Sequence, residues 1–141
     1  MDLKKQTAGF YISLLTVLTT VISIIFYLIN CKTEYFANYG MNGWIVICLI
    51  IAAAIEVAYI LGSNKKEMKK YFEIFPIIGG AVLMIAFVLF LNARVSSIAT
   101  ILSFQKNAQT MSDLSSAIAA MGCCFAAAVF NMIGAFFKVV K

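Results

Sequence analysis

Charged residues are scarce in this chain. It carries 11 basic and 6 acidic residues among 141, or 12% in total, whereas a soluble domain usually carries about 25%. Hydrophobic residues make up 63% of the sequence, and the mean hydropathy is +0.97. Because so few charges leave a folded surface without polar cover, we expect lipid to be the solvent around most of it.

Histidine is absent, and proline occurs once. The chain therefore lacks the commonest metal ligand and the usual acid–base group near neutral pH. Its four cysteines, at positions 31, 48, 123 and 124, show no C-x-x-C spacing. No candidate nucleophile is accompanied by a suitable base. We therefore expect no metal site, no cofactor and no enzymatic activity.

The charged residues are clustered, and they leave four long apolar stretches between them. About 20 apolar residues in a helix cross the hydrocarbon core of a bilayer, and a helix pairs its own backbone groups there. We predict an all-α integral membrane protein, a single domain over residues 1–141 that forms an antiparallel four-transmembrane-helix bundle. The predicted helices cover about 8–30, 42–62, 74–93 and 114–137.

The placement of lysine predicts the orientation of the chain. Basic residues are enriched in cytoplasmic loops, and an inner N-terminus gives the inner segments eight lysines against three basic residues outside. The inner set is Lys4, Lys5, Lys65, Lys66, Lys69, Lys70, Lys138 and Lys141, and the outer set is Lys32, Arg94 and Lys106. We expect a plasma membrane location with both termini cytoplasmic, and the lipid bilayer as a partner in place of nucleic acid. The first span is long for a cleavable signal peptide and lacks an A-x-A site, so we expect it to be retained.

The first predicted span carries a polar stripe. Its members recur at i+3 and i+4 and so share one helix face: Ser13, Thr16, Thr20, Ser23 and Tyr27. Hydroxyl groups in membrane helices form hydrogen bonds to neighbouring helices. The stripe is interpreted as a helix-packing face, with a polar conduit as the alternative.

Glu56 is the one acidic residue inside a predicted span. It lies about seven residues from the inner end, or roughly 10 Å at 1.5 Å per residue. Asn131 lies at a similar depth in the fourth span, and Thr16 and Tyr59 fall near the same level. We predict an intramembrane polar cluster of these four residues, in which Glu56 is either a proton or cation site or a polar clamp between helices.

The third span is followed by a segment with two features of the outer boundary. Asn92 and Arg94 are candidates for an outer-face contact with an anion or a lipid headgroup, which a long arginine side chain can reach. Beyond them, apolar and polar residues alternate at helical spacing up to Ser103. This short amphipathic outer segment either extends the third helix or lies on the outer leaflet.

Small residues recur through the first half of the fourth span. Ser115, Ala119, Gly122 and Ala126 follow the small-xxx-small pattern of closely packed membrane helices. We interpret them as a helix-packing face. Either this is the most enclosed helix of the bundle, or the face serves self-association.

Two segments resemble a known group of proteins: "AGFY" at 8–11, before a threonine-rich span, and "NARVSSIATILS" at 92–103. Both are similar to segments of small four-span membrane proteins of unassigned function from Gram-positive (Firmicutes-type) bacteria. The resemblance implies the architecture and carries no activity with it.

Two classes of function remain for such a chain. The first is a structural or accessory membrane subunit, which self-associates or joins a larger membrane complex. The second is a small oligomeric transporter or channel that uses Glu56 as its intramembrane proton or cation site. Four helices alone rarely enclose a pathway for a solute, so transport would require a homo-oligomer.

Overall fold

The computed structural model describes residues 7–63, 69–137 and 139. Four long helices dominate the described chain: α1 (Ala8–Cys31), α2 (Gly43–Gly62), α4 (Phe75–Ser103) and α5 (Ala108–Gly134). Two short elements lie between them, the 3-10 helix η2 (Ala37–Tyr39) and α3 (Lys69–Phe72). The predicted all-α, four-helix architecture is confirmed.

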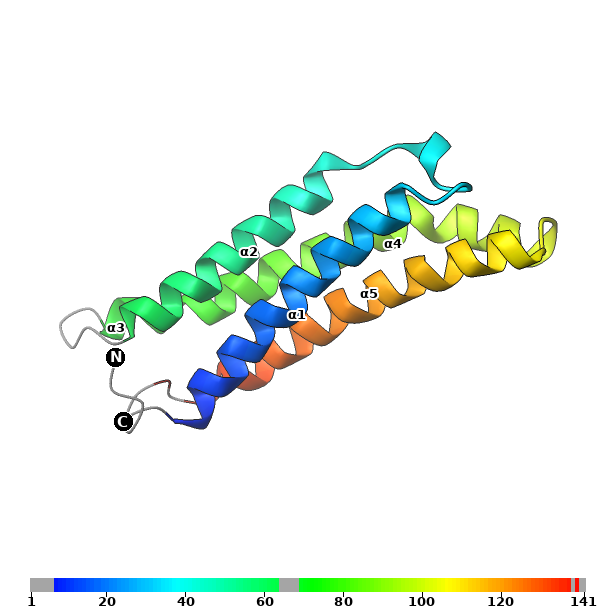
Figure 1. Ribbon diagram of the computed structural model, residues 1–141. Helices are drawn as coiled ribbons and strands as arrows, with labels where there is room; N and C mark the ends of the chain where they lie inside the picture. The colour runs from blue at the N-terminus through cyan, green and yellow to red at the C-terminus, as the bar shows by residue number, and fades with distance from the viewer. Residues whose placement is uncertain (1–6, 64–68, 138, 140–141) are drawn as a thin grey trace.

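The long helices run up and down in chain order (Figure 1). Each packs against the next one along the chain, and α1 closes the ring by packing against α5. A backbone hydrogen bond of 3.2 Å from Thr7 N to Val139 O holds the two ends of the described chain together. We call this the terminal end of the bundle, and the end with residues 32–42 and the α4–α5 connection the far end.

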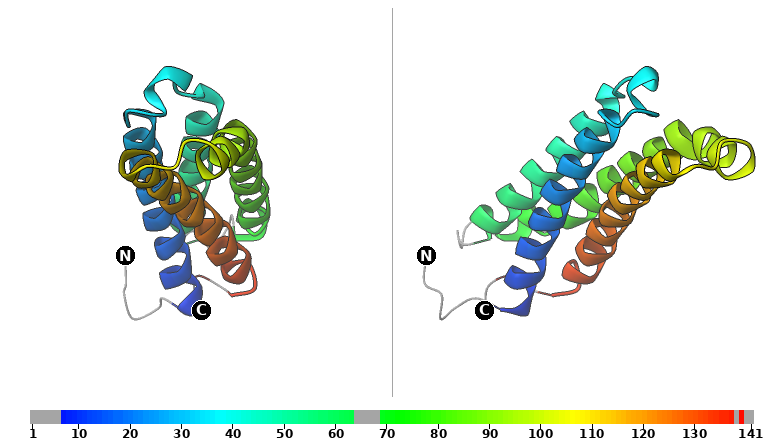
Figure 2. Two further views of the ribbon diagram at one scale, coloured as in Figure 1. Left: turned by 90° about the vertical axis from the view of Figure 1, so that its right-hand side faces the viewer. Right: turned by 45° about the vertical axis from the view of Figure 1, so that its right-hand side comes forward.

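Three helix boundaries differ from the prediction, and the first of them is the end of α5, which lies at Gly134 and not near residue 137. α4 continues without a break to Ser103, so the amphipathic segment is an extension of the third helix. α5 begins at Ala108 and not near residue 114, because Asn107 caps it: its side chain accepts a hydrogen bond from Thr110 N, and the Thr110 hydroxyl accepts one from Asn107 N. The hairpin of α4 and α5 consequently reaches beyond the far ends of α1 and α2 (Figures 1 and 2).

The polar side chains of α1 lie inside the bundle, and its apolar face lies outside. All five residues of the predicted stripe on α1 are buried, and the Ser23 hydroxyl donates to Ala120 O of α5 at 3.2 Å. The opposite face of α1 exposes large side chains such as Leu18, Ile25 and Ile29. This confirms the stripe as a packing face, and its inside-out polarity is typical of a protein in lipid.

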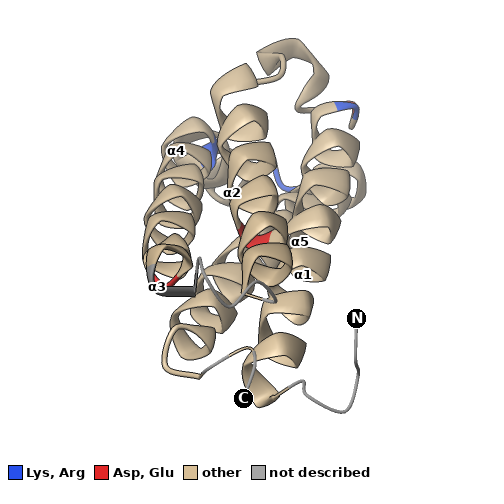
Figure 3. Cartoon of the chain, turned by 90° about the vertical axis from the view of Figure 1, so that its left-hand side faces the viewer, with Lys and Arg blue, Asp and Glu red and all other residues tan. Residues whose placement is uncertain are grey.

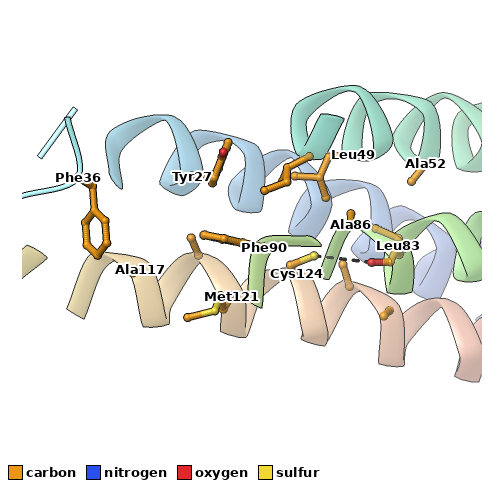
Figure 4. Packing of buried hydrophobic residues seen from close by; sticks show 14 of the residues in the cluster. Tyr27, Phe36, Leu49, Ala52, Leu83, Ala86, Phe90, Ala117, Met121 and Cys124 are labelled. Atoms are coloured by element: carbon orange, nitrogen blue, oxygen red, sulfur yellow. Dashed lines mark hydrogen bonds between the residues drawn. The ribbon is translucent and has the colours of Figure 1, made fainter. Parts of the chain in front are cut away.

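The core is narrow because α5 contributes mainly small side chains to it. Ala117, Ala120 and Cys124 are fully buried, and they pack with larger residues of α2 and α4 (Figure 4). In the same core the rings of Tyr27 and Phe90 meet edge to face, with centroids 4.8 Å apart. Among the four spans α5 has the largest buried share, 44% of its most apolar window, which confirms it as the most enclosed helix.

Charged residues are sparse along the described helices (Figure 3). All four long helices are long and apolar enough to cross a membrane. Six of the lysines on which the predicted orientation depends lie outside the described residues: Lys4, Lys5, Lys65, Lys66, Lys138 and Lys141.

Candidate functional site

The carboxyl group of Glu56 is enclosed between three helices. Glu56 lies on the buried face of α2 and is 1% exposed, and Asn131 of α5 is 3% exposed. Asn131 Nδ2 donates a hydrogen bond to Glu56 Oε1. Within the described chain, Asn131 is the hydrogen-bond partner of this carboxyl group. The predicted similarity of depth thus corresponds to direct contact.

Two adjacent glycines of α4 make room for this pair. A Cβ atom on Gly79 would lie 3.2 Å from Glu56 Oε1 and 3.5 Å from Asn131 Nδ2. A Cβ atom on Gly80 would lie 2.6 Å from Asn131 Oδ1. Since real Cβ atoms essentially never approach an oxygen so closely, a methyl group on Gly80 would force the Asn131 side chain to move. We refer to Glu56, Asn131, Gly79 and Gly80 as the Glu56 node.

Thr16 and Tyr59 are the other two members of the predicted cluster. Both are buried, at 0% and 6% exposure. The Thr16 hydroxyl donates to Ile12 O of its own helix at 3.0 Å, as threonine commonly does in membrane helices. Tyr59 packs with Phe10, Ile60 and Val139 near the terminal end. The structure therefore brings Glu56 and Asn131 together, and it gives Thr16 a local partner that depth alone does not predict.

A cavity of about 380 Å³ lies beside the node, between α4 and α5. Asn131 is its one strongly polar lining side chain, and Glu56 is not part of the lining. The remaining lining residues are Pro76, Ile77, Gly80, Ala81, Met84, Met132, Ala135 and Phe136. Such walls suit an acyl chain or an apolar side chain better than a hydrated ion.

Arg94 and Asn92 do not form one outer-face contact. They lie two residues apart on α4, which separates them by about 200° around the helix. Asn92 is exposed, whereas Arg94 is 2% exposed and lies inside the bundle. Arg94 therefore does not share an exposed surface contact with Asn92, because its side chain is directed into the space between α1, α4 and the loop after α1.

The predicted small-residue face on α5 lies outside the bundle. Ser115, Ala119 and Gly122 are exposed and Ala126 is half-buried. At about 100° per residue, these four lie opposite the buried face that contains Ala117 and Cys124. As a packing face within the bundle the prediction is therefore wrong; the bundle uses the other side of α5.

A polar network at the far end was not predicted. Asn30 is fully buried, and its amide donates to Ser116 Oγ at 2.9 Å and to Asp113 O at 3.3 Å. Asp113 Oδ2 accepts from Tyr35 N at 2.9 Å, which ties the loop after α1 to α5. The helical spacing of the α1 stripe extends to Asn30, three residues after Tyr27, and is the signal that identifies it.

This network borders a cavity of about 610 Å³ at the far end. It is lined by Glu34, Tyr35, Asn38, Tyr39, Thr100, Gln105, Asn107, Gln109, Thr110 and Asp113. Within the described ranges, no three His, Cys, Asp or Glu side chains lie close enough together to hold a metal ion. The described cysteines are free thiols.

The fold and its polarity define the chain as a multi-pass membrane protein with four candidate spans. No protein-family model, no curated protein and no solved structure matches it.

Proposed function

We propose that this chain is a non-catalytic structural or accessory subunit of a bacterial membrane. The observation that supports this most directly is the enclosure of the Glu56 node. An acidic residue in a span is expensive unless it is paired, and here its carboxyl group meets an amide from another helix while two glycines fit closely around both. This arrangement fastens α2, α4 and α5 to one another.

A transport pathway would need the opposite arrangement, in which water reaches the acid. Glu56 is 1% exposed and the adjoining cavity is almost entirely apolar. In proteoliposomes that contain a pH-sensitive dye, we expect the wild-type chain and Glu56→Gln to give the same proton flux as protein-free vesicles. A proton flux through the wild-type chain that Glu56→Gln abolishes would overturn the structural proposal in favour of the transporter.

The outward face of α5 supports a self-associating form of this subunit. In lipid, helices associate through small residues that allow close backbone approach. The side of α5 that faces away from its own bundle carries such small residues, namely Ser115, Ala119 and Gly122. A Cβ atom added to Gly122 would meet nothing within 4 Å in the single chain.

The bacterial plasma membrane, with both termini cytoplasmic, is the proposed location. It is supported by the lysine bias of the sequence and by the resemblance to four-span proteins of Gram-positive bacteria. Under this orientation the far end of the bundle faces outward.

Amine labelling tests the orientation. A membrane-impermeant reagent applied to intact cells should modify Lys32 and Lys106 and spare Lys65, Lys66, Lys69 and Lys70, because only the first two lie outside. Permeabilised cells provide the control, in which all six become accessible. Peptide mass spectrometry gives the extent of labelling at each lysine, and modification of Lys65 in intact cells would contradict the orientation.

A further inference from the structure

Arg94 is a buried cation that has no balancing carboxylate among the residues that the structure describes. It is 2% exposed. Its Nη2 group donates to Cys31 Sγ at 3.4 Å, and its guanidinium carbon lies 4.5 Å from the centre of the Phe36 ring. Its Nε group has no hydrogen-bond partner.

These contacts do not balance the charge. A thiol sulfur is a weak acceptor, and an aromatic face offers only a partial negative charge. Two acids at the far end are otherwise placed: Glu34 of the loop after α1 is exposed, and the oxygens of Asp113 of α5 accept from Tyr35 N and Gln109 Nε2. Throughout the described chain, no carboxylate lies within ion-pair distance of Arg94. A buried charge without an opposite charge beside it is strongly unfavourable.

A cavity lies beside this guanidinium group. It has a volume of about 210 Å³, and its lining combines Arg94 and Ala93 of α4 with Tyr27 and residues 39–42. A water molecule occupies about 30 Å³ of liquid, so the cavity has room for a tetrahedral oxyanion with a few waters. The Asn42 side-chain oxygen accepts from Trp44 N, which leaves its amide N–H groups as donors. Tyr39 adds a second polar residue to the lining, with its ring stacked on that of Tyr35 at a centroid distance of 5.7 Å.

The position of the cavity indicates which anion it would meet. Arg94 contacts Cys31, the last residue of α1, and the cavity includes Asn42, which caps the first turn of α2. It therefore lies where two membrane spans end, the level at which lipid phosphates are found. The planar fork of arginine matches a phosphate group with two parallel hydrogen bonds.

We propose that this cavity binds a phosphate group, held by Arg94 and assisted by Tyr39 and Asn42. The phosphate is either a free ion or the phosphodiester of an anionic lipid headgroup, since both present the same oxygens. Binding supplies the negative charge that the described part of the chain does not place beside Arg94.

Thermal unfolding of the purified chain tests the site. The arms are inorganic phosphate in a neutral detergent, phosphatidylglycerol in mixed micelles, and phosphatidylcholine or sodium acetate at matched ionic strength as controls. At a hundredfold excess over the dissociation constant we expect a rise in Tm of about 5–10 °C. A rise with inorganic phosphate identifies the free ion as a ligand, and a rise with phosphatidylglycerol alone identifies the lipid headgroup.

Three variants assign the effect to this cavity. Arg94→Met should abolish the rise in Tm, while Arg94→Lys, which keeps the charge but not the fork, should retain part of it. Tyr39→Phe removes one hydroxyl from a side chain that is 59% exposed, so it should fold normally and weaken binding by about tenfold. The proposal is overturned if neither phosphate source raises Tm, if acetate acts as well as phosphate, or if Arg94→Met or Tyr39→Phe binds like the wild type.

Discussion

Replacing Gly80 with alanine should destabilise the bundle, although alanine is the better helix former. In a helix interior, glycine to alanine alone stabilises by about 0.5–1 kcal/mol. At Gly80 the new methyl group would lie 2.6 Å from Asn131 Oδ1, so Asn131 must shift away from its bond to Glu56. Overpacking of this kind costs about 1–3 kcal/mol, and we expect a net loss of about 1–2 kcal/mol in the free energy of unfolding.

The other glycines supply a graded control series. Gly122 lies in the interior of α5, where an added Cβ meets nothing within 4 Å, so Gly122→Ala should be neutral or slightly stabilising. Gly79→Ala brings its Cβ to 3.2 Å from Glu56 Oε1. The stability of this variant should therefore lie between those of Gly80→Ala and Gly122→Ala. Denaturant unfolding followed by circular dichroism, at a detergent-to-protein ratio high enough to keep the chain monomeric, gives the order of the stabilities. Equal stabilities for Gly80→Ala and Gly122→Ala would show that the Glu56 node is not tightly packed.

The spans were predictable because the membrane imposes a simple length rule. α1 and α2 begin and end within about one residue of the predicted bounds. Lysines lie close to both ends of α1 and to the C-terminal end of α2, and the loop residues Asn38, Gly40 and Asn42 precede α2. The far ends of α4 and α5 were not predictable in this way. There the boundaries depend on the cap formed by Asn107 and Thr110 and on whether an amphipathic segment continues a helix, and hydropathy does not register either feature.

Side-chain contacts were predictable only where depth and rotation agree. The α1 stripe gives the rotation of that helix directly, because its polar positions share one face. Depth alone placed Asn131 beside Glu56 correctly, yet it also placed Thr16 there, which instead donates to Ile12 O. The spacing of small residues in α5 does not predict which face is buried. Ala117, Ala120 and Cys124 face inward, while the equally regular series through Ala119 and Gly122 faces outward. Both faces of α5 carry small residues, so side-chain size does not distinguish the buried face from the exposed one.

Removing Asn131 while keeping Glu56 should have a large effect on stability. Asn131→Leu is close in shape, but it leaves a buried carboxyl group without its donor. Leaving a buried polar group unsatisfied costs about 1–3 kcal/mol. Glu56→Met should lose a similar amount, because the Asn131 amide then lacks its acceptor, whereas Glu56→Gln keeps a side-chain oxygen that can accept and should lose less than about 1 kcal/mol.

The double variant Glu56→Met/Asn131→Leu distinguishes a clamp from two independent polar residues. When both partners become apolar, neither group is left unsatisfied, and stability should recover towards the wild type. The resulting coupling energy in a double-mutant cycle should be about 1–2 kcal/mol, near the upper range measured between membrane helices. Reversible unfolding in mixed detergent micelles gives the four free energies. Strictly additive losses would mean that the hydrogen bond between Asn131 and Glu56 contributes nothing to holding α2 against α5, and the structural role proposed for the node would have to be abandoned.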